Sequence, residues 1–336
     1  MVQAKLRWGI IGCANIAIGS VIPGIRQSKR GEVVAIASRG EEKAKQTAEK
    51  LGIPKAYGSY EAILEDPDID AVYIPLPNNL HKEWTIRAAQ AGKHILCEKP
   101  FSIDAAEAEE MVAACAEHGV KLAEAFMYRH HPRYAKIKEI IASGEIGTIR
   151  GIHGAFTFNS SRNTTNFRND VSMGGGSIYD IGVYPISAAR LLLGSEPEAA
   201  TVHAMFSPEH GGVDMMASGL LEFPGSVALT FDCAMWAASR NTLEVLGTDG
   251  RIELPSAFVC RPDEEPVFYV TTKDGRREER TEPMNQYSLQ ADDLAASVLD
   301  GAPLAFDPFD TVLNMRVVDA CLESARTRSR IVIANQ

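Results

Sequence analysis

Short apolar runs alternate with helical patterns from Leu6 to Phe126, and this alternation restricts the fold more than any other feature of the 336-residue sequence. The helical pattern Glu41–Leu51 places alanine and leucine on one face and ends at Gly52, a residue typical of helix C-termini. Strands that alternate with helices form a parallel sheet covered by helices, with right-handed crossovers. The alternation therefore predicts an α/β fold class, with a doubly wound domain over residues 1–125. Its main predicted strands are Leu6–Ile11, Val33–Ala37, Ala71–Ile74, Ile95–Cys97 and Val120–Phe126.

After residue 126 the sequence changes to runs in which polar and apolar residues alternate, a pattern typical of strands. The runs Ser218–Phe223 and Ser226–Asp232 are separated by the short turn Pro224-Gly225, which is typical of antiparallel hairpins. A glycine triplet, Gly174–Gly176, precedes a helical pattern over Ser177–Leu193. Residues 126–336 are therefore predicted to form a second, α+β domain with a mainly antiparallel sheet.

Composition and charge exclude several classes of partner. With 34 basic and 44 acidic residues the formal net charge is −10, and a net negative chain is repelled by nucleic acids and anionic membrane surfaces. The six cysteines include no C-x-x-C pair, no apolar run reaches the ~18 residues of a membrane span, and no signal peptide is recognisable. His130 and His131 are adjacent and point apart on a regular element, so no metal site is expected. We expect a cytoplasmic protein that acts on a small molecule.

The first predicted strand runs into the glycine-containing turn Gly9-Ile10-Ile11-Gly12-Cys13-Ala14-Asn15-Ile16-Ala17. A dinucleotide fingerprint needs a glycine for the tight turn and small residues for pyrophosphate approach and helix packing. Gly12, Ala14 and Ala17 occupy these positions. Because the turn follows the first strand and opens a helix, we expect it to bind a pyrophosphate; the alternative is a tight turn without a ligand. The cofactor-binding residues predicted here are Gly9, Gly12, Ala14, Asn15 and Ile16.

The end of the second predicted strand indicates which dinucleotide is bound. An acidic residue there binds the ribose hydroxyls of NAD, whereas arginine accommodates the 2′-phosphate of NADP. The sequence places Ser38 and Arg39 at this point, with Lys43 as support, so a hydroxyl and a guanidinium stand where the acid would be. NADP(H) is therefore predicted rather than NAD(H). The alternative is that Arg39 is a solvated surface charge.

Two further groups of residues predict the chemistry. Lys99, in Glu98-Lys99-Pro100, follows a strand directly, and ligands of doubly wound sheets lie beyond the carboxyl ends of strands. Asp180 and Tyr184 are four residues apart in a helical pattern, so both are expected to project from one helix face. A carboxylate and a phenol in this arrangement can hold a polyol and transfer one of its hydroxyl protons. Taken alone, the helix equally fits a surface aspartate beside a partly buried tyrosine.

In combination, several segments resemble the family of glucose–fructose oxidoreductase, inositol dehydrogenase and rhizopine-catabolism proteins. They occur in the family's order over residues 9–184. The matching segments are Gly9–Ala17, Pro75–His81, Glu98–Pro100, Ala125–Pro132 and Gly174–Tyr184. The family often has histidine at the position of Tyr184. The tyrosine resembles the branch of glucose–fructose oxidoreductase, xylose dehydrogenase, dimeric dihydrodiol dehydrogenase and keto-sugar reductases.

The resemblance implies a nicotinamide-dependent sugar or polyol oxidoreductase whose C-terminal domain has an open sheet, commonly the interface of a homodimer or homotetramer. It implies that Lys99 is the central catalytic residue and that Asp180 helps to hold the substrate. The predicted catalytic residues are Lys99, Tyr184 and Asp180, and the predicted substrate contacts are Tyr128, Arg129, Asp180 and Tyr184. The further cofactor-binding residues predicted are Pro75, Leu76, Asn78, His81, Glu98, Lys99 and Arg168.

The predicted mechanism moves a hydroxyl proton between the substrate and Tyr184 while hydride moves between carbon and nicotinamide. A free phenol titrates near ~10, so the ammonium group of Lys99 is expected to favour the phenolate. The predicted function is that of an NADP-dependent sugar oxidoreductase, such as an aldose 1-dehydrogenase acting on xylose or glucose. The alternatives are a reductase of keto-sugars, including 1,5-anhydrofructose and nucleotide sugars, a trans-dihydrodiol dehydrogenase, and a non-catalytic NADP-sensing regulator.

Overall fold

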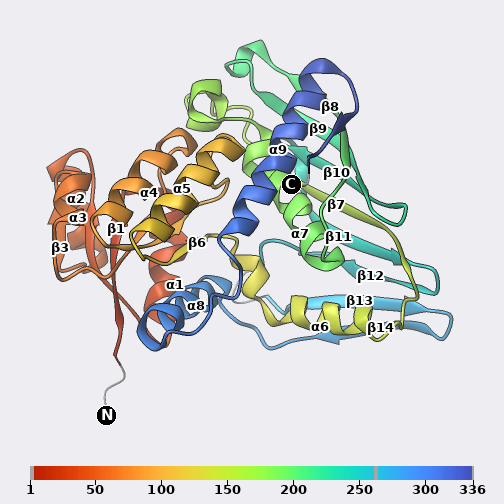
Figure 1. Ribbon diagram of the computed structural model, residues 1–336, viewed down its shortest axis with the longest axis horizontal. Helices are drawn as coiled ribbons and strands as arrows, with labels where there is room; N and C mark the ends of the chain where they lie inside the picture. Colours follow the sequence, from red (N-terminus) through yellow and green to blue (C-terminus); the bar gives the residue numbers. More distant parts are fainter. Residues whose placement is uncertain (1–3, 261–263, 335–336) are drawn as a thin grey trace. The chain divides into compact units, whose positions relative to one another are not determined.

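The computed structural model of the protein describes residues 4–260 and 264–334 (Figure 1). The chain forms two compact units. The first contains residues 4–130 together with Met284–Val312, and the second contains His131–Pro283 together with residues 313–334.

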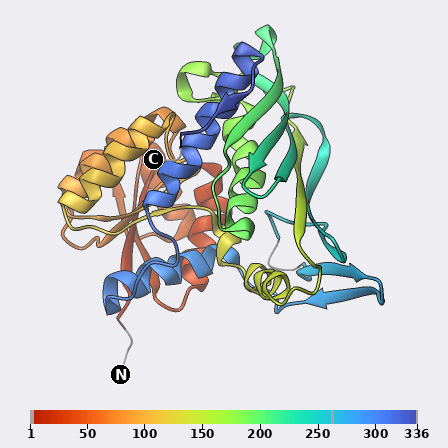
Figure 2. The ribbon, with the colours of Figure 1, turned by 45° about the vertical axis from the view of Figure 1, so that its right-hand side comes forward.

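The first unit is built on a six-stranded sheet in the order β3-β2-β1-β4-β5-β6, and all its strand pairs are parallel. This is the order of a doubly wound dinucleotide-binding sheet, so the predicted fold class is confirmed. Helices α4 and α5 pack against each other, as Figures 1 and 2 show. The strands are β1 (Leu6–Ile11), β2 (Gly31–Ala37), β3 (Lys55–Tyr57), β4 (Ala71–Ile74), β5 (His94–Cys97) and β6 (Leu122–Glu124). The helices are α1 (Ile22–Gln27), α2 (Glu41–Leu51), α3 (Tyr60–Leu64), α4 (His81–Gln90) and α5 (Ala105–Glu117).

A helix from late in the sequence, α8 (Gln286–Asp300), completes the first unit. Its buried Leu294 joins the apolar cluster that contains Trp8 and Ile10 of β1. A Cβ atom at Gly24 of α1 would lie 2.5 Å from the Cβ atom of Tyr287, so glycine permits the close packing of α1 and α8. The sequence predicts a helix here but assigns it to the second domain, because a local pattern does not show which sheet a helix covers.

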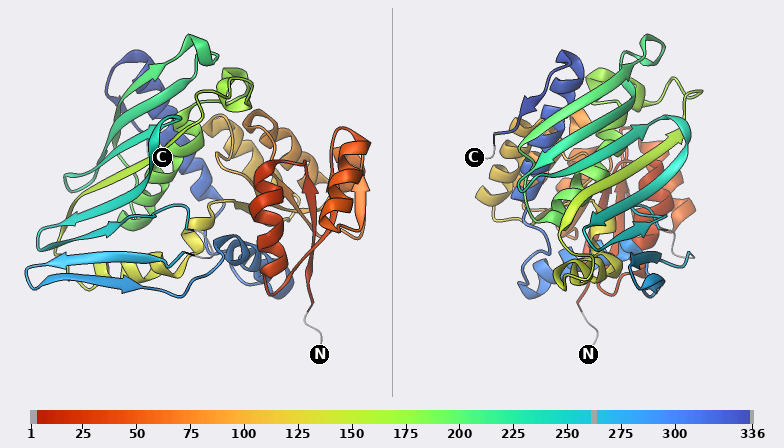
Figure 3. Two further views of the ribbon diagram at one scale, coloured as in Figure 1. Left: turned by 180° about the vertical axis from the view of Figure 1, so that it is seen from behind. Right: turned by 90° about the vertical axis from the view of Figure 1, so that its right-hand side faces the viewer.

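The second unit contains a nine-stranded sheet in the order β14-β13-β12-β11-β7-β10-β9-β8-β15. The predicted antiparallel sheet is confirmed, with β7 and β10 pairing in parallel. The helix α7 (Val183–Leu193) packs against β7 and β10. In the right-hand view of Figure 3 these strands lie in front of α7, so their other face is turned toward the viewer. The strands are β7 (Ile149–Asn159), β8 (Ala199–Phe206), β9 (Asp214–Phe223), β10 (Val227–Ala234), β11 (Trp236–Gly247), β12 (Gly250–Leu254), β13 (Val267–Thr272), β14 (Gly275–Arg280) and β15 (Ile331–Val332). The other helices are α6 (Pro132–Ala142) and α9 (Phe309–Thr327), which begins in the first unit.

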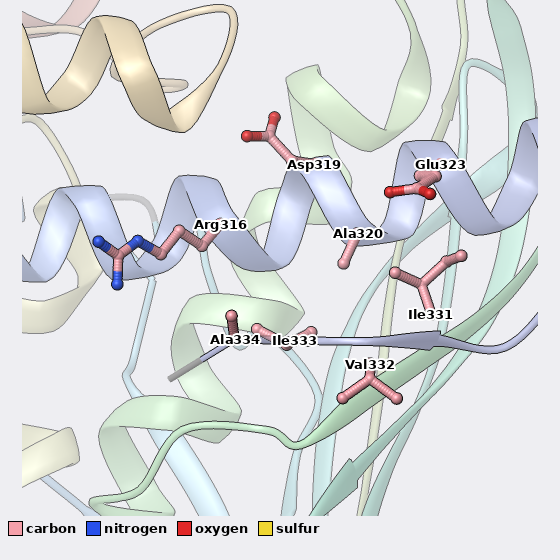
Figure 4. A pocket seen from close by; sticks show the side chains of 8 residues that line it. All are labelled: Arg316, Asp319, Ala320, Glu323, Ile331, Val332, Ile333 and Ala334. Atoms are coloured by element: carbon pink, nitrogen blue, oxygen red, sulfur yellow. The ribbon is translucent and has the colours of Figure 1, made fainter. Parts of the chain in front are cut away.

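A shallow hollow of about 350 Å³ lies between the C-terminal half of α9 and β15 (Figure 4). Its charged side chains are Arg316, Asp319 and Glu323 of α9, and its opposite wall is aliphatic. None of the residues predicted for catalysis or cofactor binding lines it. Within residues 4–260 and 264–334, no helix is long and apolar enough to cross a membrane.

Candidate active site

The glycine turn after β1 has the shape that a pyrophosphate requires. Gly12 has a φ of +115°, and its N–H donates to the carbonyl of Ala37 at 3.0 Å. A Cβ atom at Gly12 would lie 3.1 Å from Cδ2 of Leu76, so a larger residue would crowd this turn. Asn15 and Ile16 are exposed at the start of the helical segment that follows. These features fit the approach of a phosphate group to backbone N–H donors.

Gly9 lies within β1 and has a different environment. A Cβ atom there would lie 3.1 Å from the side chains of both Ile63 and Ile69. The absence of a side chain therefore lets these two apolar residues pack on the strand. This packing explains the glycine without a ligand, and cofactor contact by Gly9 stays a prediction.

The end of β2 places Ser38 and Arg39 close to the same turn. Ser38 is buried, and its N–H donates to the carbonyl of Tyr57 on β3. Arg39 is exposed, and its charge acts on the hydroxyl of Tyr60. Burial raises the pKa of Tyr60, while the charge of Arg39 opposes this rise. A Cβ atom on Gly12 would lie 3.8 Å from the same hydroxyl, so Tyr60 lies beside the turn.

Sequence reasoning did not find Tyr60. Its ring packs edge-on against Trp84 of α4, with ring centroids 4.9 Å apart, so the hydroxyl is held in place. Lys43 is exposed in the first turn of α2, and its support of a phosphate stays a prediction.

His81 joins the loop after β4 to the loop after β5. Its ring is fully buried, and its Nδ1 and Nε2 lie 2.9 Å from the carbonyl oxygens of Pro100 and Leu76, respectively. Burial lowers the pKa of His81, and the charge of Lys99 acts in the same direction, while the backbone hydrogen bonds oppose it. Both ring nitrogens are engaged by the protein's own backbone. The structure thus shows His81 holding the two loops together, and its contact with a cofactor stays a prediction. Pro75, Leu76 and Asn78 of the same loop are also buried.

Lys99 follows β5 at the carboxyl edge of the parallel sheet, and its peptide bond to Pro100 is cis. The preceding residue, Glu98, donates its N–H to the carbonyl of Ile74. Its Oε1 accepts a hydrogen bond of 2.5 Å from the hydroxyl of Tyr73, which lies fully buried in β4. Burial raises the pKa of Tyr73 well above its usual value, and the charge of Glu98 adds to this rise. Tyr73 therefore holds the carboxylate next to Lys99.

In the second unit, Asp180 and Tyr184 lie on one continuous helical segment. Asp180 belongs to a π-helical turn, η6 (Ile178–Gly182), which runs directly into α7 and Tyr184. Both side chains are largely buried, with residue exposures of 8% and 5%. π-helical turns occur frequently at functional sites because they displace side chains from the regular helical spacing. The sequence predicts a regular helix here and does not reveal this turn.

Arg168 is paired with Asp180. Its Nε lies 2.8 Å from Oδ2 of Asp180, and its carbonyl accepts the N–H of Gly176. A Cβ atom at Gly175 would lie 2.4 Å from this carbonyl, so glycine is needed for the loop to approach the helix. The contact that the structure shows for Arg168 is thus with a predicted substrate-binding carboxylate, and its contact with a cofactor stays a prediction.

Two phenylalanines flank the ring of Tyr184. Phe156 of β7 packs at 68° with ring centroids 5.1 Å apart, and Phe258 packs on the ring with centroids 5.6 Å apart. The two phenylalanines stack on each other at 5.5 Å. Aromatic rings at these separations attract one another and restrict motion. The phenol is therefore held by packing as well as by its helix.

Tyr128 and Arg129, the predicted substrate contacts in the first unit, are both buried there. Tyr128 is fully buried and packs edge-on against Phe126. The Arg129 side chain is 6% exposed, pairs with Asp310, and lies over the ring of Phe306 at 4.2 Å. The sequence shows no sign of the Asp310 pairing, which joins residues far apart in the chain. The contacts that the structure shows for Arg129 are with Asp310 and Phe306, and substrate contact by Tyr128 and Arg129 stays a prediction.

Within the described part of the chain, no group of three or more histidine, cysteine, aspartate or glutamate side chains could hold a metal ion. The six cysteines are free thiols, and all except Cys13 are buried.

Comparisons with known proteins agree with this architecture. Residues 6–126 match a family model described as an oxidoreductase family with an NAD-binding Rossmann fold. Residues 134–253 match the GFO/IDH/MocA C-terminal domain. An uncharacterised oxidoreductase of Rhizobium meliloti, ORF334, is 41% identical over 95% of this chain and 97% of its own length.

Two further relatives carry more specific names. D-xylose 1-dehydrogenase (NADP(+)) 2 of Haloferax volcanii is 39% identical over 97% of this chain and 99% of its own length. The crystal structure of a 3-ketoreductase from Actinomadura kijaniata with NADP and TDP-benzene is 33% identical, with a TM-score of 0.90 over 95% of this chain and 98% of that one. The chain therefore belongs to the GFO/IDH/MocA oxidoreductase family and is an NAD(P)-dependent oxidoreductase.

Proposed function

We propose that this protein is an NADP-dependent sugar oxidoreductase that transfers hydride between a nicotinamide and a sugar carbon. The main proposal is an aldose 1-dehydrogenase acting on D-xylose or D-glucose. The observation that carries it is the helix on which Asp180, paired with Arg168 at 2.8 Å, precedes the aromatic-packed Tyr184. A carboxylate, a guanidinium and a phenol together offer acceptors and donors for several sugar hydroxyls.

In the proposed mechanism, Lys99 and Tyr184 act on the substrate hydroxyl. The Tyr184 phenolate takes the proton from the substrate hydroxyl as that carbon is oxidised, and the phenol returns it in the reverse reaction. The ammonium group of Lys99 stabilises the phenolate and polarises the substrate oxygen. Asp180 holds a neighbouring hydroxyl and thereby orients the reacting carbon. The nicotinamide, when bound, supplies the hydride acceptor or donor.

The cofactor preference is proposed to depend on Ser38 and Arg39. Together with the turn at Gly12, these residues fit a dinucleotide that carries a 2′-phosphate, because a hydroxyl and a guanidinium stand where NAD-binding proteins place an acid. The Haloferax relative is named for NADP, and the Actinomadura structure contains it. Dissociation constants of NADP and NAD, measured by calorimetry, test this proposal. Equal affinities would contradict it.

A substrate panel tests the reaction. Aldoses with NADP, and keto-sugars and nucleotide keto-sugars with NADPH, are compared by the absorbance of NADPH. Preferred oxidation of D-xylose or D-glucose supports the main proposal. Preferred reduction of a keto-sugar supports the second candidate, which the similarity to the Actinomadura 3-ketoreductase favours. Preferred oxidation of a trans-dihydrodiol, or NADP binding without any turnover, would overturn both candidates.

Two variants test the acid–base residues in the same assay. Tyr184→Phe and Lys99→Ala are expected to lower kcat by roughly a hundredfold or more, as loss of general acid–base catalysis does. NADP binding to Tyr184→Phe, measured separately, is expected to stay unchanged. Near-parental turnover in both variants would refute the assignment.

We further propose that the protein is cytoplasmic and associates with a second copy through the face of the nine-stranded sheet opposite α7. The free thiols support a cytoplasmic location. Leu220 of β9 and Leu246 of β11 are exposed, although Leu221 and Val245 beside them are buried. These exposed apolar side chains support association through the sheet. Light scattering of the wild type and of Leu246→Glu tests the assembly. A monomeric wild type would contradict it.

A further inference from the structure

A buried carboxylate outside the predicted site meets the helix that carries Asp180 and Tyr184. Asp214 is the first residue of β9 and is 2% exposed. Its Oδ2 accepts hydrogen bonds from the hydroxyl of Ser177 and from the backbone N–H of Ile178, both at 2.8 Å. Ser177 is the N-cap residue of the π-helical turn η6, and Ile178 is its first residue.

The side chain of Ser177 does not cap its own helix. It donates instead to Asp214, so a carboxylate from a distant strand supplies the acceptor at this helix end. Unsatisfied N–H groups and the helix dipole both favour a negative group at this position. Asp214 therefore stabilises the helix start electrostatically and also fixes its position relative to β9.

The contact of Asp214 with the helix start explains why glycine occurs at position 176. Gly176 has a φ of +122°, and a Cβ atom there would lie 2.0 Å from Oδ1 of Asp214. No other residue leaves room for the carboxylate. The neighbouring Gly175 makes the corresponding room for the loop that carries Arg168. The triplet thus admits Asp214 and the Arg168 loop to the same helix end.

The backbone transmits this anchoring to the predicted catalytic residues. The N–H of Asp180 donates to the carbonyl of Gly176, and the N–H of Gly176 donates to the carbonyl of Arg168, both at 3.0 Å. Ser177 and Ile178, which Asp214 holds, lie within this same turn. A displacement of the turn would move Asp180 away from Arg168 and rotate the segment that leads to Tyr184.

We propose that Asp214 is a positioning residue that fixes the helix carrying Asp180 and Tyr184 in its reactive orientation. This inference rests on the acid–base assignment made above for Tyr184. Burial raises the pKa of Asp214 to about 6, and the hydrogen bonds from Ile178 and Ser177 oppose this rise. The side chain is therefore mainly ionised at neutral pH and able to accept both hydrogen bonds.

The test compares Asp214→Asn with Asp104→Asn. Asp104, the N-cap residue of α5, also accepts a backbone N–H at a helix start, that of Glu107 at 2.7 Å, but α5 carries none of the predicted catalytic residues. Each purified variant is assayed with D-xylose and NADP, or with the panel sugar that the wild type converts fastest. The melting temperature and the number and affinity of NADPH sites per chain are measured alongside.

We expect Asp214→Asn to lower kcat by roughly tenfold or more, since small displacements of reacting groups have effects of this size. The NADPH affinity and the number of sites should stay within about twofold of the wild type. Asp104→Asn should keep its kcat. A kcat for Asp214→Asn within about twofold of the wild type, or an equal loss in both variants, would overturn the proposal.

A milder variant covers the case in which Asp214→Asn does not fold. Ser177→Ala removes one of the two hydrogen bonds and keeps the carboxylate, so it should give a smaller loss of kcat in the same direction. Wild-type kcat in Ser177→Ala, together with failure of Asp214→Asn to fold, would mean that Asp214 acts only on stability. Near-parental turnover in Tyr184→Phe, in contrast, would show that the acid–base assignment itself had failed.

Discussion

The hydrogen bond between Tyr73 and Glu98 gives the sharpest test of how the loop after β5 is held. The bond is 2.5 Å long, and its donor is fully buried in β4. Tyr73→Phe removes only the hydroxyl and leaves the ring in place. A hydrogen bond to a charged group contributes about 1.5–3 kcal/mol, so we expect a loss near 2 kcal/mol.

Two measurements test the effect of Tyr73→Phe, one on stability and one on catalysis. For a unit of this size, 1 kcal/mol corresponds to roughly 2–4 °C, so the first unit should melt about 4–8 °C lower. Since Glu98 is directly followed by Lys99, release of its carboxylate should also displace the ammonium group. We expect kcat to fall by roughly tenfold, measured with the panel sugar that is converted fastest.

Tyr57→Phe is the matched control. The Tyr57 hydroxyl also donates to a carboxylate, that of Asp66, at 2.7 Å. Asp66 additionally accepts hydrogen bonds from Lys55 and from the N–H of Asp68, so the loss of one donor should cost at most about 1 kcal/mol. If Tyr73→Phe destabilises the protein no more than Tyr57→Phe and keeps wild-type kcat, the reasoning about the hydrogen bond between Tyr73 and Glu98 is refuted.

Three further predictions follow from the same kind of contact. Tyr60→Phe should weaken NADP binding by roughly threefold to tenfold while leaving NAD binding unchanged, and it should have no effect in an Arg39→Ala background, as calorimetry can show. Burial alone would raise the pKa of Asp66, but hydrogen bonds from β3 side chains and a backbone N–H lower it to about 2. Because the native state then binds fewer protons than the unfolded chain, stability should be lost as the pH falls from about 4 to about 2, and denaturation of Asp66→Asn should lack this part of the pH dependence. Arg129→Ala should destabilise the protein by about 3 kcal/mol through loss of the ion pair with Asp310. An increased KM for the sugar would support the predicted substrate contact, and an unchanged KM would contradict it.

The parallel sheet could be predicted from the sequence because its signals are local. Each buried strand is a continuous apolar run, and in each crossover helix apolar residues recur at the helical spacing. The assignment of α8 to the first unit could not be predicted, because it depends on Leu294 packing against β1, more than 280 residues earlier in the chain. The parallel pairing of β7 with β10 could not be predicted either, because short turns indicate pairing only between strands that are consecutive in the sequence.

The candidate site likewise contains residues that local motifs predict and residues whose partners lie far away in the sequence. Lys99, Asp180 and Tyr184 follow motifs with fixed spacing, so sequence reasoning singled them out. Tyr73 and Asp214 lie in apolar or mixed strand patterns, and nothing nearby indicates their partners. One signal existed for Tyr73: a tyrosine inside a fully buried strand must find a partner for its hydroxyl. The sequence does not show that this partner is Glu98.

Tyr73 and Asp214 also explain how the predicted reactive groups can be held in place. In each unit a fully or largely buried strand residue hydrogen-bonds a neighbour of a predicted catalytic residue: Tyr73 bonds Glu98 beside Lys99, and Asp214 bonds the turn that contains Asp180. The reacting atoms can then meet substrate while the groups that orient them stay away from water. Substitutions of Tyr73 and Asp214 should affect kcat far more than cofactor affinity, whereas a substitution of Tyr60, on which the charge of Arg39 acts, should affect the choice of cofactor and leave kcat unchanged. The two classes of variant therefore separate catalysis from cofactor recognition by their kinetic effects, and a variant of Tyr73 or Asp214 that changed only NADP affinity would contradict this division.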